Sequence, residues 1–259
     1  MIDPGVRRIA LADGEDDLVV EEPLEIRVDG RPLAVLMRTP GEDLDLAAGF
    51  LATEGVVEDP RDLAGLSHCL DPSIPDRHNV VLAALAAGVE AGAERFERAQ
   101  RALHALSGCG LCGKASIERV FQHAPPLPAR RALAPGQIAT LAEALRAAQP
   151  RFARTGGLHG AALFSADGAV LVAREDVGRH NAVDKVIGAR LRADHWPLEG
   201  TALVVSSRAG FEIVQKALVA RIGAVIAVGA ASTLAHDLAV EGRLALYSFA
   251  RGGRYRTHA

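Results

Sequence analysis

The alternation of apolar and polar positions predicts two halves that are built from different patterns of elements. In the first half, apolar residues recur either at every second position or at helical spacing. The elements predicted there are strands over residues 23–28, 33–37 and 79–85 and helices over residues 40–55 and 95–106. The turn Asp29-Gly30 joins the first two strands, because this dipeptide favours a two-residue hairpin loop. We therefore predict a small α+β domain over residues 1–106.

From Pro135 onward the pattern predicts strands and helices that alternate. The predicted strands cover residues 161–165, 169–174, 201–206, 224–228 and 244–249, and the predicted helices cover residues 135–149, 177–192, 211–222 and 232–241. The last three strands are almost entirely apolar, which is typical of strands that are covered on both faces. This pattern predicts a three-layer α/β domain over residues 134–259. Lys185 and Lys216 fall on predicted helices, where we expect them to be exposed charges.

Composition restricts the functions that the chain can have. The 259 residues carry a net charge of −3, so no overall basic field indicates a nucleic-acid partner. Residues 1–22 contain no apolar segment typical of a signal peptide, and the longest apolar run, residues 222–235, is too short and too rich in Gly and Ala for a membrane span. Three cysteines cannot form a complete disulfide framework, and they fit a reducing compartment better. We therefore expect a cytoplasmic protein that does not bind membranes.

The most distinctive stretch is Ser107-Gly108-Cys109-Gly110-Leu111-Cys112-Gly113-Lys114. Glycines flank both cysteines and allow backbone conformations that expose the two sulfur atoms. Lys114 can help to keep a thiol in its thiolate form, which is the nucleophilic form. A Pro-rich segment, residues 125–128, follows, so we predict a mobile loop and linker over residues 107–133.

Three other interpretations of the two cysteines remain open at this point. Structural zinc would need further ligands, which Cys69, His68 or His104 could supply in space. A thioredoxin-like pair would follow a strand and open a helix, whereas this pair follows a predicted helix. Two small apolar side chains without chemistry are the third interpretation, although buried structural cysteines are seldom framed by glycines.

Polar and glycine-rich turns end several predicted strands of the second half, where α/β domains bind their ligands. These turns contain residues 155–160, 174–181, 206–212 and 249–254. In the last of them Arg251 and Arg254 surround Gly252 and Gly253, and arginine grips phosphate bidentately while glycine lets a backbone approach it. The alternative is that both arginines are solvated surface charges. His180 and Asp184 lie four positions apart on a predicted helix, either as an acid–base pair or as a surface pair.

The motifs resemble those of the formate dehydrogenase accessory sulfurtransferases (FdhD), over nearly the whole chain. The motifs that carry the resemblance are Glu21-Glu22-Pro23-Leu24-Glu25-Ile26, Met37-Arg38-Thr39-Pro40-Gly41-Glu42, Gly49-Phe50-Leu51-Ala52-Thr53-Glu54-Gly55, the cysteine loop, Thr155-Gly156-Gly157-Leu158-His159, Glu175-Asp176-Val177-Gly178-Arg179-His180-Asn181-Ala182 and the final Phe249-x-Arg251-Gly252-x-Arg254. The resemblance implies a second domain like cytidine deaminase and a homodimer. It also implies transfer of a persulfide sulfur from a cysteine desulfurase to the molybdenum or tungsten bis(guanine dinucleotide) cofactor, before that cofactor enters the catalytic subunit of formate dehydrogenase.

The resemblance also implies roles for individual residues. Cys109 matches the persulfide-carrying cysteine of the family. Cys112 would assist Cys109 or resolve its persulfide. The stretch Phe249, Ala250, Arg251, Gly252, Gly253 and Arg254 is expected to bind the guanine dinucleotide, with further walls formed by Gly156, Gly157, His159, Asp176, Gly178, Arg179 and His180. Asp176 is the expected acceptor for guanine N–H groups. The chain departs from the family pattern at Ser207, Gly210 and Ala231, in turns that should border this site.

Two other functions compete with sulfur transfer. Zinc-dependent deamination would need a His-x-Glu or Cys-x-Glu sequence and Pro-Cys-x-x-Cys, and the chain has neither. The second is a non-catalytic chaperone that binds the cofactor and delivers it to the apoenzyme. A Cys→Ala variant that still binds the cofactor would separate binding from sulfur transfer.

Overall fold

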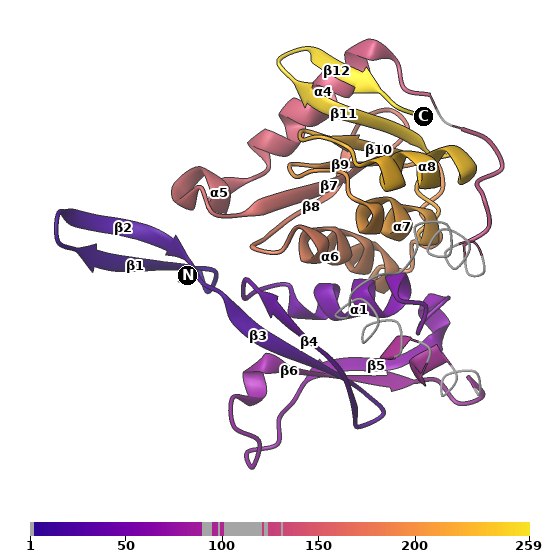
Figure 1. The fold of residues 1–259 in the computed structure, drawn as a ribbon. Helices are drawn as coiled ribbons and strands as arrows, with labels where there is room; N and C mark the ends of the chain where they lie inside the picture. Colours follow the sequence, from indigo (N-terminus) through magenta and orange to yellow (C-terminus); the bar gives the residue numbers. More distant parts are fainter. Residues whose placement is uncertain (1–2, 90–94, 98, 101–120, 122–123, 131) are drawn as a thin grey trace.

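Two sheets organise the residues that the computed structural model describes, which are residues 3–89, 95–97, 99–100, 121, 124–130 and 132–259 (Figure 1). The boundary predicted at residue 106 lies outside this part of the chain, so the division into domains stays a prediction. The mixed α/β fold is confirmed. Among the described residues, no helix is long and apolar enough to cross a membrane.

The second half forms a six-stranded sheet with the strand order β12-β11-β10-β9-β7-β8. Its strands are β7 (His159–Phe164), β8 (Val170–Asp176), β9 (Ala202–Val205), β10 (Ala224–Ala227), β11 (Ala245–Arg251) and β12 (Arg254–Thr257). β9, β10 and β11 are parallel, whereas β7, β8 and β12 each run antiparallel to a neighbour. The prediction of apolar strands covered on both faces is correct for β9 and β10, whose residues are all buried, whereas Phe249 of β11 is exposed.

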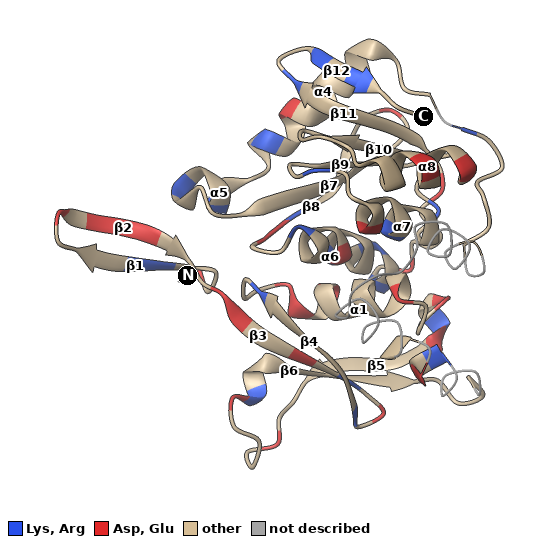
Figure 2. Cartoon of the chain, viewed as in Figure 1, with Lys and Arg blue, Asp and Glu red and all other residues tan. Residues whose placement is uncertain are grey.

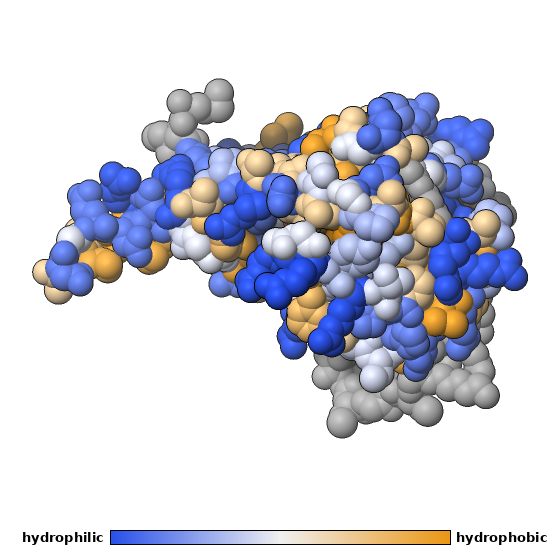
Figure 3. Space-filling view, turned by 90° about the horizontal axis from the view of Figure 1, so that it is seen from above, coloured by the Kyte–Doolittle hydropathy of each residue, from blue (hydrophilic) through white to orange (hydrophobic). Residues whose placement is uncertain are grey.

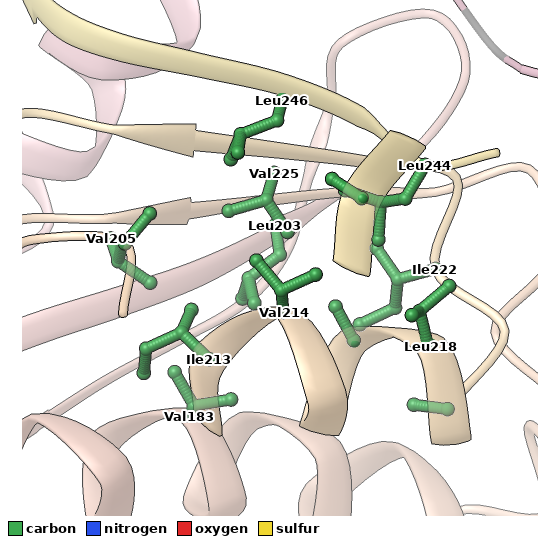
Figure 4. Packing of buried hydrophobic residues seen from close by; sticks show 14 of the residues in the cluster. Val183, Leu203, Val205, Ile213, Val214, Leu218, Ile222, Val225, Leu244 and Leu246 are labelled. Atoms are coloured by element: carbon green, nitrogen blue, oxygen red, sulfur yellow. The ribbon is translucent and has the colours of Figure 1, made fainter. Parts of the chain in front are cut away.

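Helices cover both faces of this sheet and give it three layers. The helices are α4 (Pro135–Ala147), α5 (Pro150–Thr155), α6 (Arg179–Arg192), α7 (Phe211–Val219) and α8 (Thr233–Glu241). α4 packs on one face through Ile138, Leu141 and Leu145. α6, α7 and α8 pack on the other face, where Val183, Val214 and the residues labelled around them fill the space below the strands (Figure 4). Burying each such side chain contributes about 1.5–3 kcal/mol to the stability of the fold.

The first half forms a four-stranded sheet with the order β4-β3-β6-β5. Its elements are β3 (Glu22–Val28), β4 (Arg31–Arg38), α1 (Asp43–Thr53), the 3-10 turns η1 (Pro60–Asp62) and η2 (Arg77–Asn79), β5 (Leu63–His68) and β6 (Val80–Leu85). The predicted Asp29-Gly30 turn is confirmed, since Val28 pairs directly with Arg31 and both turn residues have positive φ. The sequence pattern did not indicate β5. Of the predicted helix over residues 95–106, the described residues 95–97 and 99–100 are helical.

Helices α1 and α6 join the two sheets through an unusually close contact. A Cβ atom added to Gly49 of α1 would lie 1.9 Å from the carbonyl oxygen of Asp184. A Cβ atom added to Gly188 of α6 would lie 1.9 Å from the carbonyl oxygen of Asp45. Both distances are far below van der Waals contact, so the two backbones can touch only because glycine occupies both positions.

Two lysines at this junction contradict the expectation that they are exposed helix charges. Lys185 has no exposed surface and Lys216 is 5% exposed. The Lys185 Nζ lies 2.8 Å from Asp176 Oδ2, and the Lys216 Nζ lies 2.9 Å from Asp184 Oδ2. The prediction was wrong because each lysine finds a buried carboxylate, which offsets the desolvation of its ammonium group.

A hairpin of β1 (Val6–Leu11) and β2 (Gly14–Val19) projects from the body as an arm (Figures 1 and 3). Basic residues lie on β1 and acidic residues on β2 (Figure 2), and Arg8 faces Asp17 directly across the hairpin. Asp17 pairs with Arg8 at 2.9 Å and with Arg154 of α5 at 3.0 Å, so the arm is tied to the helix next to it. No element was predicted for these residues from the sequence.

Candidate functional site

The cysteines of the predicted loop, Cys109 and Cys112, lie outside the described residues. Their chemistry therefore stays a prediction from the sequence. Cys69 is described, and it is a free, buried cysteine. Among the described residues no cluster of three or more His, Cys, Asp or Glu side chains could hold a metal ion.

The described part of the chain forms a pocket of about 670 Å³ where α4 and α5 meet the edge of the six-stranded sheet. Four segments that are distant in sequence line it. The lining residues are Ala139, Ala142, Glu143, Leu145, Arg146, Gln149, Phe152, Gly156, Gly157, Leu158, His159, Ser206, Val228, Ala250, Arg251 and Gly252. The volume lies within the range of about 300–1,000 Å³ that is typical of small-molecule sites.

The structure therefore brings together two of the glycine-rich turns that the sequence analysis had singled out. Gly156, Gly157 and His159 come from the turn between α5 and β7, and Ala250, Arg251 and Gly252 come from the end of β11. These two turns are about ninety positions apart in the chain. They line the same pocket because β7 and β11 belong to the same sheet. Gly156, which ends α5, has a φ of +66°, a value that L side chains rarely adopt.

The arginine-glycine stretch is the hairpin turn that joins β11 to β12. β11 continues through Arg251, and Arg254 pairs with it across the Gly252-Gly253 turn. The two glycines have φ values of +58° and +75°. Arg251 and Arg254 are both exposed, and of the two only Arg251 lines the pocket. Phe249, which is 46% exposed, lies under the guanidinium of Arg256 at 5.1 Å.

His159 is held at the start of β7 with its ring about half-buried. Burial lowers the pKa of His159, and the positive charge of Arg179 lowers it further, while Asp176 acts in the opposite direction. The ring is therefore neutral at pH 7, with one nitrogen that donates and one that accepts. The next residue, Gly160, donates its N–H to Ser206 Oγ at 2.9 Å, which fixes the end of β9 against the pocket.

The Asp176 carboxylate is buried and is held by partners from both halves of the chain. Its carboxylate has no exposed surface. It accepts hydrogen bonds from the backbone N–H groups of Thr39 and Gly178 at 3.2 and 2.8 Å and from Asn181 Nδ2 at 2.9 Å, in addition to the Lys185 ion pair. These partners occupy the carboxylate and connect the two halves of the chain, and the role of Asp176 as an acceptor for guanine N–H groups stays a prediction.

The remaining predicted wall residues, Gly178, Arg179 and His180, do not line the pocket. The His180 Nε2 atom lies 3.8 Å from Glu212 Oε2 at the start of α7. Burial lowers the pKa of His180 to about 4, and the charge of Arg179 contributes to this shift. His180 does not pair with Asp184, as the sequence spacing had allowed, because Asp184 is engaged with Lys216 and Thr53.

The wall that α4 and α5 contribute was not predicted from the sequence. The Arg146 guanidinium lies 4.6 Å from the centre of the Phe152 ring, and both residues line the pocket. Gln149, between the two helices, is 3% exposed, and its Nε2 has no hydrogen-bond partner. One feature of the sequence could have indicated this wall. Gln149 is a polar residue directly before Pro150, at a helix junction close in sequence to the glycine-rich turn at residues 155–160.

Comparison with known proteins gives consistent matches over the chain. The model of the FdhD/NarQ family matches residues 19–259. The protein named sulfur carrier protein FdhD of Streptomyces coelicolor is 46% identical over 261 residues, which cover 98% of this chain and 91% of the relative. A protein of the same name from Anaeromyxobacter dehalogenans is 46% identical over 94% of this chain and 87% of the relative.

A solved structure shows the same fold. The crystal structure of a protein described as a candidate formate dehydrogenase accessory protein, from Desulfotalea psychrophila, superimposes with a TM-score of 0.72. The match covers 98% of this chain and 94% of that chain at 21% sequence identity. The likeness to cytidine deaminase stays a prediction.

Proposed function

This chain belongs to the FdhD/NarQ family, and from that premise we propose that it is a sulfurtransferase that serves the maturation of formate dehydrogenase. The observation that carries the proposal is 46% identity, over 98% of the chain, to a relative named sulfur carrier protein FdhD. The donor is a cysteine desulfurase, and the acceptor is the molybdenum or tungsten bis(guanine dinucleotide) cofactor. The protein acts in the cytoplasm as a homodimer.

Cys109 carries the sulfur. Its thiolate attacks the terminal sulfur of the persulfide on the desulfurase, a new S–S bond forms, and the desulfurase thiolate leaves. Once the acceptor is bound, Cys112 attacks the Cys109 sulfur, which releases the terminal sulfur to the acceptor as hydrosulfide and leaves a Cys109–Cys112 disulfide. The released sulfur gains two electrons, and the two cysteines supply these electrons when they form the disulfide. A cellular dithiol reductant restores the pair. Lys114 favours the thiolate that starts the sequence.

The pocket next to Arg251 takes the guanine nucleotide part of the cofactor, which is the cargo of this reaction. Three features of the described residues fit such a ligand. Arg251 offers a fixed positive charge for a phosphate, and the backbones of Gly156 and Gly252 can approach it without side chains. The α4–α5 wall is mainly apolar and suits a planar base.

A non-catalytic chaperone is the competing function. It would use the same pocket to bind the cofactor, but it would need no thiol chemistry. The glycine-flanked cysteine pair favours sulfur transfer, because binding and delivery need no nucleophilic thiol.

The persulfide intermediate can be measured directly. The protein is incubated with a cysteine desulfurase and cysteine, and its intact mass is recorded. We expect one added sulfur in the wild type and in Cys69→Ala, which is the matched control at a buried cysteine. We expect none in Cys109→Ala.

An added sulfur that persists in Cys109→Ala but disappears in Cys112→Ala would reverse the two roles. Stoichiometric zinc in the purified protein, with no added sulfur, would refute the proposal and assign the cysteines to a metal site.

A further inference from the structure

The arm of β1 and β2 exposes apolar side chains on one of its faces (Figure 3). Ile9 and Leu11 point to the same side of β1, because side chains two positions apart share a face of a strand. Leu18, which pairs with Arg7, lies on that side of β2. Leu11 is 48% exposed and Leu18 is 44% exposed. At the base of this face, Ile9, Leu18 and Val20 line a groove of about 330 Å³.

Contacts within the chain hold the arm against α5 and leave its apolar face open to solvent. Arg8 pairs with Asp17 at 2.9 Å, and Asp17 also pairs with Arg154 of α5 at 3.0 Å. Val19 packs on the turn after α5, since a Cβ atom added to Gly157 would lie 2.8 Å from Val19 Cγ2. An isolated two-stranded hairpin is only marginally stable in water, so burial of the apolar face would stabilise the arm.

The same groove carries one positive and one negative charge that are not paired within the described part of the chain. Arg7 and Glu21 both line the groove and are both exposed. Glu22, the other acidic residue of the groove, lies 3.5 Å from Arg38 Nη1. Neither Arg7 nor Glu21 forms an ion pair with another described residue. The groove therefore offers a partner an apolar surface with two opposite charges beside it.

We propose that this face of the arm docks on the same face of a second copy of the chain, around a two-fold axis. The inference rests on the proposed function, in which the protein acts as a homodimer. In a two-fold interface every contact occurs twice, so Arg7 faces Glu21 of the partner subunit and Glu21 faces Arg7 of the partner subunit. Leu11 and Leu18 of both copies leave water together. A partner with charges of one sign would match one of the two groups and repel the other, whereas a second copy matches both.

The test measures the dissociation constant of the dimer by sedimentation velocity on the full chain over a range of concentrations. Arg7→Glu and Glu21→Arg each place like charges across the two-fold axis, and each should weaken the dimer about tenfold or more. An equimolar mixture of these two variants restores both contacts between opposite charges. The mixture should therefore dimerise to within about threefold of the wild type. An effect confined to one chain could not be rescued by mixing.

A third variant tests the apolar part of the interface. Leu18→Arg places a charge in the apolar contact and should also weaken the dimer about tenfold or more. Val240→Arg is the matched control, because Val240 is 43% exposed on α8, away from the arm. It should leave the dimer unchanged. Circular dichroism and a thermal melt confirm that each variant is folded.

Several results would overturn the inference. A wild type that stays monomeric at all concentrations would do so, and so would a dimer that is unchanged in the three arm variants. A mixture of Arg7→Glu and Glu21→Arg that does not recover would overturn the two-fold contact. Arm variants that still dimerise but no longer bind the apo form of the formate dehydrogenase catalytic subunit would assign the arm to that partner instead.

Sulfur loading by a cysteine desulfurase, measured on the same variants, judges the proposed function separately. A monomeric arm variant that takes up one sulfur would support the interface and leave the role of Cys109 intact. A wild type that dimerises through the arm but takes up no sulfur would refute sulfur transfer alone.

Discussion

The most informative perturbation of the fold is Lys216→Met at the junction of the two halves. The Lys216 Nζ lies 2.9 Å from Asp184 Oδ2, 2.9 Å from Thr53 Oγ1 and 3.2 Å from Glu54 Oε1. It therefore joins α7 to both α1 and α6. Methionine has a similar length but no charge, so the substitution leaves the Asp184 carboxylate buried without its cation.

The expected loss of stability follows from the burial of the remaining group. The Asp184 side chain is 2% exposed. Removing one partner of a buried ion pair costs about 3–5 kcal/mol, because the other charge stays desolvated. For a protein of this size, that loss corresponds to a decrease in Tm of roughly 6–20 °C.

The loss should also depend on pH in a defined direction. Burial raises the pKa of Asp184 to about 6 even with Lys216 present, so its carboxyl favours the protonated form more in the folded than in the unfolded chain. Protonation of Asp184 therefore stabilises the folded protein. This stabilisation is fully present below pH 4 and is lost as the pH rises through 6. Without Lys216 the pKa of Asp184 rises further, and the variant should be closer to the wild type at pH 5 than at pH 8.

Urea unfolding followed by circular dichroism at pH 5 and pH 8 measures both effects. The double variant Lys216→Met/Asp184→Leu removes both charges, and it should recover much of the stability that Lys216→Met loses at pH 8. A loss below about 1 kcal/mol at pH 8 would refute the reasoning, since that is the value of an exposed pair. An equal loss at both pH values would refute the role of Asp184.

Two further predictions concern the junction and the site next to it. Gly49→Ala and Gly188→Ala should each lower the Tm by more than about 6 °C, because the new methyl group meets a backbone carbonyl. Gly136→Ala, which has open space around it, should not lower the Tm by that much. Similar melting temperatures for all three variants would disprove the close contact. The His180 ring should titrate in NMR spectra with a pKa near 4, and Arg179→Gln should raise that value. Because the pKa of an unfolded-state histidine is about 6.5, His180 should reduce folding stability as the pH falls from 6.5 to 4, and an NMR midpoint near 6.5 would contradict its burial.

The sequence predicted elements well where local chemistry determines them. The Asp29-Gly30 turn and the apolar strands β9 and β10 follow from turn preference and from burial on both faces. The arm at residues 6–19 was missed because neither of its strands has a continuous apolar face.

The environment of charged and polar side chains could not be read from the sequence in the same way. Lys216 looks like any exposed lysine on α7, and its partner Thr53 lies 163 positions earlier in the chain. The pocket depends on the same kind of long-range placement. Arg251 and Gly157 stood out because of glycine and arginine patterns, whereas Gln149 gains its meaning only from packing on Gly160.

The measurement that tests the central claim most directly is the transfer of labelled sulfur to the cofactor. The protein is loaded with ³⁵S from labelled cysteine by a desulfurase, separated from the donor and mixed with purified molybdenum bis(guanine dinucleotide) cofactor. We predict that the label moves to the cofactor with the wild type, that it moves much more slowly with Arg251→Ala/Arg254→Ala, and that Cys109→Ala takes up no label. Label that stays on a protein that binds the cofactor tightly would contradict sulfur transfer and identify the chain as a chaperone.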